Sequence, residues 1–380
     1  MPAKSKLALA ITAFMLICIV FNRSNWIDRD MLRCDEAGYY LYLPSLIIYH
    51  DVGKLSFYQK MTYKYYINEN NSNYGIFNEP TGYRLNKYPA GVSILEMPFF
   101  LAAHLFCTIC PKDYPPDGYS EPYMLMFVLA TVFWVIAGLF VLRRFLLSYF
   151  TDATVALTIL LLAFATNIYF YTVFETGMSH TFSFALFCFL LAATRQWYDN
   201  ERSINVLLMG LILGLIVITR PTNIVVAIIP LCWKYKNGQI SEKLAFYKKQ
   251  ALPLLASLFI FFLVVMIQCR YWKYVTGHWI HFSYEDEGFN FLSPQVWRGL
   301  FSYQKGWFIY TPVAFLGVAG LILLARKYKR LAAIITVYLA VNIYIVFSWY
   351  YWSYAGSFGC RPLWIGLVVP GQMRSTLPNN

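Results

Sequence analysis

The chain has 380 residues, of which 59% are hydrophobic, 19% aromatic and only 13% charged. Soluble domains carry about 25% charged residues, so this composition excludes an ordinary soluble protein and indicates a polytopic membrane protein. The formal net charge of +12 would suggest a nucleic-acid partner in a soluble chain. Here much of the excess lies in short connections between apolar runs, where the positive-inside bias places it, so we expect no nucleic-acid partner.

Apolar runs long enough to cross a membrane recur along the chain. About 20 residues span a hydrocarbon core of about 30 Å as a helix, whereas a β-barrel would show alternating segments of about ten residues. The sequence therefore predicts an all-α fold, with one transmembrane domain over residues 1–365 and a short tail at 366–380 without a soluble domain. We expect about ten membrane segments, at 7–21, 91–110, 122–147, 153–173, 178–194, 204–219, 221–233, 251–272, 308–325 and 331–352.

The first run follows Lys4 and Lys6 and has no small-residue cleavage site. It is therefore expected to be a retained first helix, with the N-terminus in the cytoplasm. Residues 23–89 then form a long first extracytoplasmic loop, which is too polar to span the membrane but rich in tyrosine. Within it, residues 38–49 carry apolar side chains at helical spacing, which predicts an interfacial helix.

The loop charges give two conflicting predictions for the side of the membrane on which Arg143–Arg144 lie. Basic segments at 234–249 and 326–330 are expected in the cytoplasm, and counting back from them puts this pair inside. Counting forward from a cytoplasmic N-terminus puts it outside. Either the run at 91–110, which a glutamate and a proline interrupt, is a re-entrant or half-spanning segment, or the arginine pair is an exception to the rule.

Two adjacent carboxylates, Asp35 and Glu36, stand near the start of the first loop, between Arg33 and a cluster of tyrosines. A carboxylate just outside a membrane can act as general base on an acceptor hydroxyl or amine. The alternative is a solvated pair of loop residues without a chemical role.

The order of these motifs resembles that of the GT-C glycosyltransferases. A first helix is followed by a long outer loop that opens with Asp35-Glu36-x-x-Tyr39-Tyr40, and Lys87-Tyr88-Pro89-Ala90-Gly91 leads into the next apolar run. This pattern is similar to that of the protein O-mannosyltransferases and the lipid A aminoarabinose transferases, which use dolichyl- or polyprenyl-phosphate sugars. The resemblance implies that Asp35 is the catalytic base, with Glu36 beside it, in an inverting displacement.

The resemblance extends over about residues 5–235, and two departures qualify it. Ala90 stands where the family has a second proline. The chain also stops soon after Arg361, whereas these enzymes usually continue with more helices or a soluble domain. A member truncated at its C-terminus is therefore one interpretation.

A lipid-phosphate donor requires cationic side chains, and arginine suits bidentate contact with phosphate. Arg84 and Lys87 come just before the second apolar run. Arg220 lies between two apolar runs, where an uncompensated charge is expensive, and Arg361 follows a glycine-rich turn. We expect these four residues to bind the donor phosphate. The alternative for Arg220 and Arg361 is an interfacial arginine that reaches out to water.

Two further polar groups are candidates. Glu175 and His180 lie between apolar runs at the expected outer surface, where ionisable residues are by default functional hypotheses, and we expect them to contact the acceptor or a cation. His278 and His281 have a spacing that would place both imidazoles on one helix face, but an ordinary loop is preferred. No metal site is predicted, and a divalent cation is left open as a cofactor.

The sequence thus predicts a membrane glycosyltransferase that moves a hexose or pentose from a polyprenyl-phosphate donor to an unknown acceptor at the extracytoplasmic face. The expected location is the bacterial inner membrane, with membrane lipid as a further partner. Three alternatives remain: a transporter or flippase of lipid-linked sugars, which would carry ionisable residues in mid-helix; a polysaccharide polymerase or ligase, which would carry its largest outer loop late; and a non-catalytic truncated paralogue.

Overall fold

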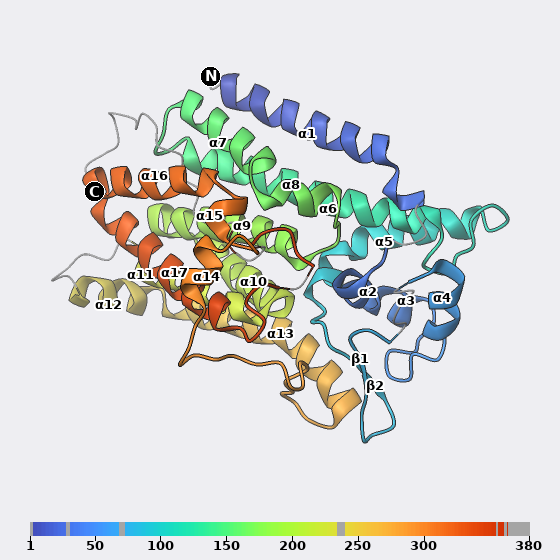
Figure 1. The fold of residues 1–380 in the computed structure, drawn as a ribbon. Coiled ribbons are helices and arrows are strands. Elements are labelled where there is room, and N and C mark those ends of the chain that lie inside the picture. Colours follow the sequence, from blue (N-terminus) through green and yellow to red (C-terminus); the bar gives the residue numbers. More distant parts are fainter. Residues whose placement is uncertain are drawn as a thin grey trace.

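The computed structural model describes residues 3–27, 31–67, 73–233, 240–354, 356–360 and 363. These residues are mostly helical (Figure 1), as the sequence predicts. Within them, five helices are long and apolar enough to span a membrane: α1 (Ala3–Arg23), α5 (Gly91–Ile109), α6 (Glu121–Leu146), α13 (Ala251–Thr276) and α17 (Lys329–Ser348).

A sixth span is formed if α7 (Asp152–Phe164) and α8 (Asn167–Val173), which are bent by 56° relative to each other, are taken together. Five or six spanning helices are consistent with a multi-pass membrane protein, but the predicted count of about ten is not confirmed. The other predicted runs form helices that are shorter or less apolar, namely α9 (Ser179–Asn200), α10 (Ser203–Thr219), the 3-10 helix η2 (Pro221–Ala227), α11 (Ile228–Cys232) and α16 (Val313–Lys327).

The connections between these helices carry the remaining elements. Those of the first loop are η1 (Asn25–Ile27), α2 (Cys34–Tyr40), α3 (Tyr42–Ile47), α4 (Tyr58–Tyr65), β1 (Ile76–Asn78) and β2 (Arg84–Asn86). Those of the second half are α12 (Ile240–Lys249), α14 (Val296–Phe301) and α15 (Trp307–Tyr310). The helix predicted over 38–49 is thus confirmed as helical structure, but it is divided between α2 and α3.

The first loop is folded and packed. Strands β1 and β2 pair antiparallel, with Phe77 opposite Leu85, and this hairpin lies beside the end of α13 (Figure 1). Tyr40 and Leu43 of α2 and α3 are fully buried and belong to the same hydrophobic core as the long helices. The described part of the loop therefore packs against the helix ends.

One end of the bundle gathers the N-terminus with basic residues, and we call it the basic end. Asp152 at the start of α7 accepts hydrogen bonds from the backbone nitrogens of Lys4 at 2.8 Å and Ser5 at 3.1 Å. Arg143 at the end of α6 donates to Ser5 Oγ at 2.9 Å. Arg143–Arg144 therefore lie at the same end as the N-terminus, and the first-loop helices lie at the opposite end (Figure 1).

Helix α5 explains how this arrangement arises, because both of its ends contact the first-loop end. Gly91 at its start lies so close to α10 that a Cβ atom would be 2.4 Å from the backbone nitrogen of Thr219. The connection after α5 is held by the first loop, where Tyr40 Oη donates to the carbonyl of Gly118 at 2.5 Å and Tyr65 Oη to Asp117 at 2.6 Å. The run at 91–110 passes the test for a span as α5, so the choice between the two alternatives for it stays a prediction.

Candidate functional site

The first-loop end brings together side chains from four separate parts of the chain. They come from α2, from the stretch before α5, from the junctions around α9 and α10, and from the connection between α13 and α14. The polar contacts between them define a candidate site.

Asp35 lies in the first turn of α2 and is half-exposed. Tyr88 Oη donates a hydrogen bond to Asp35 Oδ1 at 2.7 Å. Burial, and then the negative charge of Asp35, raises the pKa of the Tyr88 hydroxyl well above its usual value, so this hydroxyl remains a donor. The ring of Tyr88 fills the space beside Gly38, where a Cβ atom would be 2.0 Å from it. Asp35 is therefore a positioned carboxylate.

Glu36 has a different environment from its neighbour. It is only 7% exposed, so its side chain belongs to the interior of the folded loop. Asp35 is the member of the pair that is open to a substrate.

Arg220 is held where α10 ends. The backbone turns to an extended conformation at this residue, and Pro221 starts η2. The guanidinium Nη1 lies 3.3 Å from His180 Nε2 and the guanidinium carbon 5.8 Å from the ring centre of Tyr354. His180 is 4% exposed, and a buried imidazole beside a guanidinium makes a site suited to an anion.

Tyr39 links Arg220 to the helix that carries Asp35. Its hydroxyl donates to Ser179 Oγ at 3.2 Å, next to His180, and its ring centre lies 5.0 Å from that of Tyr88. A continuous path of contacts therefore runs from the base candidate to the phosphate-binding candidate.

Lys87 forms an ion pair with Glu287, at 2.6 Å between Nζ and Oε1, and its side chain is only 10% exposed. The ammonium also lies 4.9 Å from the ring centre of Tyr284. This pairing attaches the connection after α13 to the stretch before α5. It also means that Lys87 is already neutralised by a carboxylate.

The half-buried Tyr284 contacts these groups through Lys87. Desolvation raises the pKa of its hydroxyl well above the usual value, and Tyr39 contributes to the rise. The negative charges of Asp35 and Glu287 add to this rise in the pKa, and the positive charge of Arg220 opposes it. We call the set Asp35, Tyr39, Lys87, Tyr88, His180, Arg220, Tyr284 and Glu287 the Asp35–Arg220 cluster.

The fold thus gathers four of the residues proposed from the sequence, namely Asp35, Lys87, His180 and Arg220. Tyr39, Tyr88, Tyr284 and Glu287 were not proposed as site residues. Glu287 belongs to an acidic stretch that is visible in the sequence, but nothing local indicates that it pairs with Lys87.

Other proposed residues are not part of this cluster. Arg84 lies on β2 and its guanidinium donates to Asn73 Oδ1 within the first loop. Glu175 is half-buried after α8, next to Phe174, whose ring lies 4.0 Å from the guanidinium of Arg23. Arg361 is outside the residues that the structure describes.

The histidine pair is not on a helix, so the same-face arrangement considered for it is wrong. Helix α13 ends at Thr276 and Gly277 adopts a φ of 82°. His281 Nε2 instead lies 3.8 Å from Glu79 Oε1. In the described part of the chain, no group of three or more His, Cys, Asp or Glu side chains is arranged to hold a metal ion.

Comparison with known proteins adds no relative, because no family model, curated protein or solved structure matches the chain. The chemistry of the cluster is therefore the basis for interpretation. It combines a carboxylate anchored by Tyr88, a guanidinium beside a buried imidazole, and tyrosine rings beside the ends of apolar helices.

Proposed function

We propose that the chain is a membrane glycosyltransferase that moves a sugar from a polyprenyl-phosphate donor to an acceptor, with Asp35 as general base. The observation that best supports this proposal is the path of contacts that runs from Asp35 through Tyr88 and Tyr39 to the segment where His180 meets Arg220. A base for the acceptor and a cation for the donor phosphate are the two groups that this transfer requires. The apolar helices beside them suit a lipid-linked donor.

In the proposed reaction the acceptor hydroxyl attacks the anomeric carbon of the sugar and Asp35 takes its proton. The bond between this carbon and the phosphate oxygen breaks, and the lipid phosphate leaves with the electron pair. Arg220, with His180 beside it, stabilises the leaving phosphate through charge-assisted hydrogen bonds. Attack from the face opposite the phosphate inverts the anomeric configuration.

The other residues have subsidiary roles in this proposal. Tyr88 orients Asp35, and Lys87 is a second phosphate ligand that exchanges its bond with Glu287 for one to the donor. Arg84 is not assigned a role, because its guanidinium is engaged with Asn73. We place the cluster at the extracytoplasmic face, because the opposite end of the bundle carries the basic residues that favour the cytoplasm.

One observation favours the alternative of a transporter or flippase for lipid-linked sugars. Glu96 lies within α5 and is 1% exposed, and neither of its carboxylate oxygens has a hydrogen-bond partner among the residues that the structure describes. A buried ionisable group inside a membrane helix is the feature that transport predicts. Its position in α5, whose two ends contact the same end of the bundle, is less suited to a path across the membrane.

Transfer of radiolabelled sugar by the purified full chain separates the two functions. We expect Asp35→Asn to lower the rate by about 10²-fold or more, since general bases contribute about 10²–10⁴-fold. Asp113→Asn, the same change at an exposed carboxylate outside the cluster, and Glu96→Gln should leave the rate unchanged. A flippase would show the reverse, with lipid movement sensitive to Glu96→Gln. Full transfer by Asp35→Asn would exclude the proposed base.

A further inference from the structure

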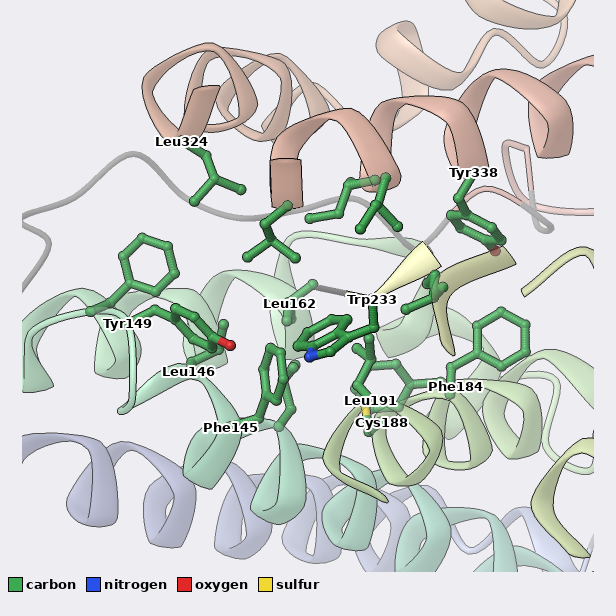
Figure 2. A pocket seen from close by; sticks show the side chains of 17 residues that line it. Phe145, Leu146, Tyr149, Leu162, Phe184, Cys188, Leu191, Trp233, Leu324 and Tyr338 are labelled. Carbon is green, nitrogen blue, oxygen red and sulfur yellow. The ribbon is translucent and has the colours of Figure 1, made fainter. Parts of the chain in front are cut away.

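A second site candidate lies at the basic end, away from the Asp35–Arg220 cluster. It is a cavity of about 120 Å³ whose lining comes from α6, α7, α9, α11, α16, α17 and the turns next to them. Figure 2 shows apolar side chains such as Leu162, Leu191 and Trp233 pointing into it, with Tyr149 and Tyr338 on opposite sides. The lining residues are nearly all apolar.

The cavity arises because the C-terminal helix pair meets the rest of the bundle on either side of it. At the basic end, Leu324 of α16 and Ala332 of α17 pack with Leu146 and Phe150 in a small separate core. Further along α17, the ring of Tyr338 meets that of Phe187 on α9, with 6.5 Å between their centres. The cavity lies between these two contacts.

Water is a poor occupant for such a space. A buried water requires two to four polar partners, and the lining residues offer few. Protein interiors are close-packed, so a cavity between membrane helices is expected to be occupied by an apolar group. Leu142, Leu191 and Ile335 of the lining are half-exposed, so the gap opens to the outside of the bundle, where lipid chains are the available apolar material.

Cationic side chains flank this opening. The guanidinium carbon of Arg195 lies 5.4 Å from the ring centre of Tyr149, and a hydrogen bond joins Arg195 to Ser148. Tyr149 in turn meets Tyr328, at 6.1 Å between ring centres, and the ammonium of Lys327 lies 5.6 Å from the Tyr328 ring centre. An apolar cavity with cationic side chains at its opening is complementary to a lipid with a negatively charged headgroup.

Besides its contacts with Ser148 and Tyr149, Arg195 forms an ion pair that is partly exposed. Its Nε lies 3.2 Å from Asp199 at i,i+4, and both side chains are about one third exposed, 30% and 34%. Exposed helix pairs of this kind contribute little to stability. A phosphate can therefore compete with Asp199 for the guanidinium.

We propose that this cavity binds one acyl chain of an anionic membrane phospholipid, with Arg195 and Lys327 binding the headgroup phosphate. The basic end is the one that the positive-inside bias places at the cytoplasmic leaflet, where anionic lipids attract basic segments. This lipid site is separate from the proposed donor site at the other end of the bundle.

Native mass spectrometry of the purified full chain tests the proposal. The protein is offered equal amounts of phosphatidylglycerol and phosphatidylcholine with identical acyl chains. We expect preferential binding of phosphatidylglycerol, and a loss of about fivefold in that binding for Arg195→Gln. Arg202→Gln removes an exposed charge at the same end and should have no effect.

The apolar part of the site is tested by filling it. Leu191→Trp should abolish retention of both lipids, whereas Leu211→Trp, at an exposed leucine of α10, should not. If Leu191→Trp does not fold, Leu191→Phe makes the same test with a smaller ring. Equal binding of the two lipids by the wild type would overturn the proposal. Unchanged lipid retention in the filled variant would also overturn it. A third contradicting result would be that a polyprenyl phosphate displaces bound phosphatidylglycerol while phosphatidylglycerol does not displace bound polyprenyl phosphate.

Discussion

Asp35 owes its position to Tyr88, which comes 53 residues later in the chain. The Tyr88 ring is accommodated by Gly38 on one side and Gly75 on the other, since a Cβ at either position would come within 2.6 Å of it. Residues with larger side chains would displace the ring. The orientation of the carboxylate thus depends on glycines that take no part in chemistry.

Tyr88→Phe removes the hydrogen bond to Asp35 and keeps the ring. Hydrogen bonds to charged groups contribute about 1.5–3 kcal/mol, so we expect the transfer rate to fall about tenfold or more while thermal stability stays close to that of the wild type. Tyr63→Phe, at an 88% exposed tyrosine of the same loop, is the matched control. An unchanged rate in Tyr88→Phe would show that Asp35 needs no anchor.

Asp51 gives the first loop a dependence on pH. Partial burial raises the pKa of its carboxyl, but hydrogen bonds from the Ser56 hydroxyl and from the backbone nitrogens of Ser56, Lys54 and Leu55 outweigh burial and lower it below 3.8. Because the folded pKa is lower than the unfolded one, the stabilisation is present above about pH 3.9 and is lost as the pH falls through the folded value.

We therefore expect Asp51→Asn to lower the melting temperature at pH 6, and the difference from the wild type to shrink at pH 3. Thermal unfolding of both proteins at the two pH values measures this. A difference that stays constant between pH 6 and pH 3 would contradict the assignment.

At the scale of elements, we predict that the path of α5 departs from a simple crossing. Its sequence passes a length and hydropathy test for a span, yet contacts at both of its ends join it to the first loop. A helix α5 that returns the chain to the first-loop end would allow α6 to carry Arg143–Arg144 to the same end as the N-terminus. Hydropathy measures how apolar a helix is and does not specify where its ends lie.

Thiol accessibility in intact cells tests the path of α5. With the exposed or half-exposed Cys18, Cys34, Cys110 and Cys232 replaced by serine, Asp113→Cys should react with a membrane-impermeant reagent that labels the outer surface, and Arg144→Cys should not. Protection of residue 113 together with labelling of residue 144 would mean that α5 crosses the membrane.

The break between α10 and η2 positions Arg220 in the Asp35–Arg220 cluster. Pro221 has no backbone N–H to donate and fixes its own φ, which favours an extended conformation at the preceding residue. Arg220 adopts such a conformation, with φ −157° and ψ 106°. Its side chain is thereby directed toward His180 and away from the helix axis.

For the whole molecule, apolar run length predicted where most of the helices occur. The run at 122–147 is α6 (Glu121–Leu146), and that at 251–272 lies within α13 (Ala251–Thr276). The number of spans was not predictable in the same way, because runs such as 204–219 and 221–233 fold as short helices. The β1–β2 hairpin was also missed, since its three-residue strands are too short to show an alternating pattern.

The site was predictable only in part. Asp35 and Arg220 stand out in the sequence because charged residues beside apolar runs are rare and need a reason. The pairing of Lys87 with Glu287 joins residues 200 positions apart, and the contact of Tyr39 with Ser179 joins residues 140 apart. Such contacts leave no local spacing pattern in the sequence, so they are visible only in the folded chain. The catalytic roles of these residues remain predictions.

Binding of a polyprenyl-phosphate sugar to the purified full chain tests the central claim most directly, because it separates the phosphate-binding cation from the base. We predict that Arg220→Gln weakens binding about tenfold or more, through loss of charge-assisted hydrogen bonds. Asp35→Asn should bind the donor like the wild type, as should Arg298→Gln, which removes an exposed arginine of α14. Donor binding by Arg220→Gln that equals the wild type would contradict the account.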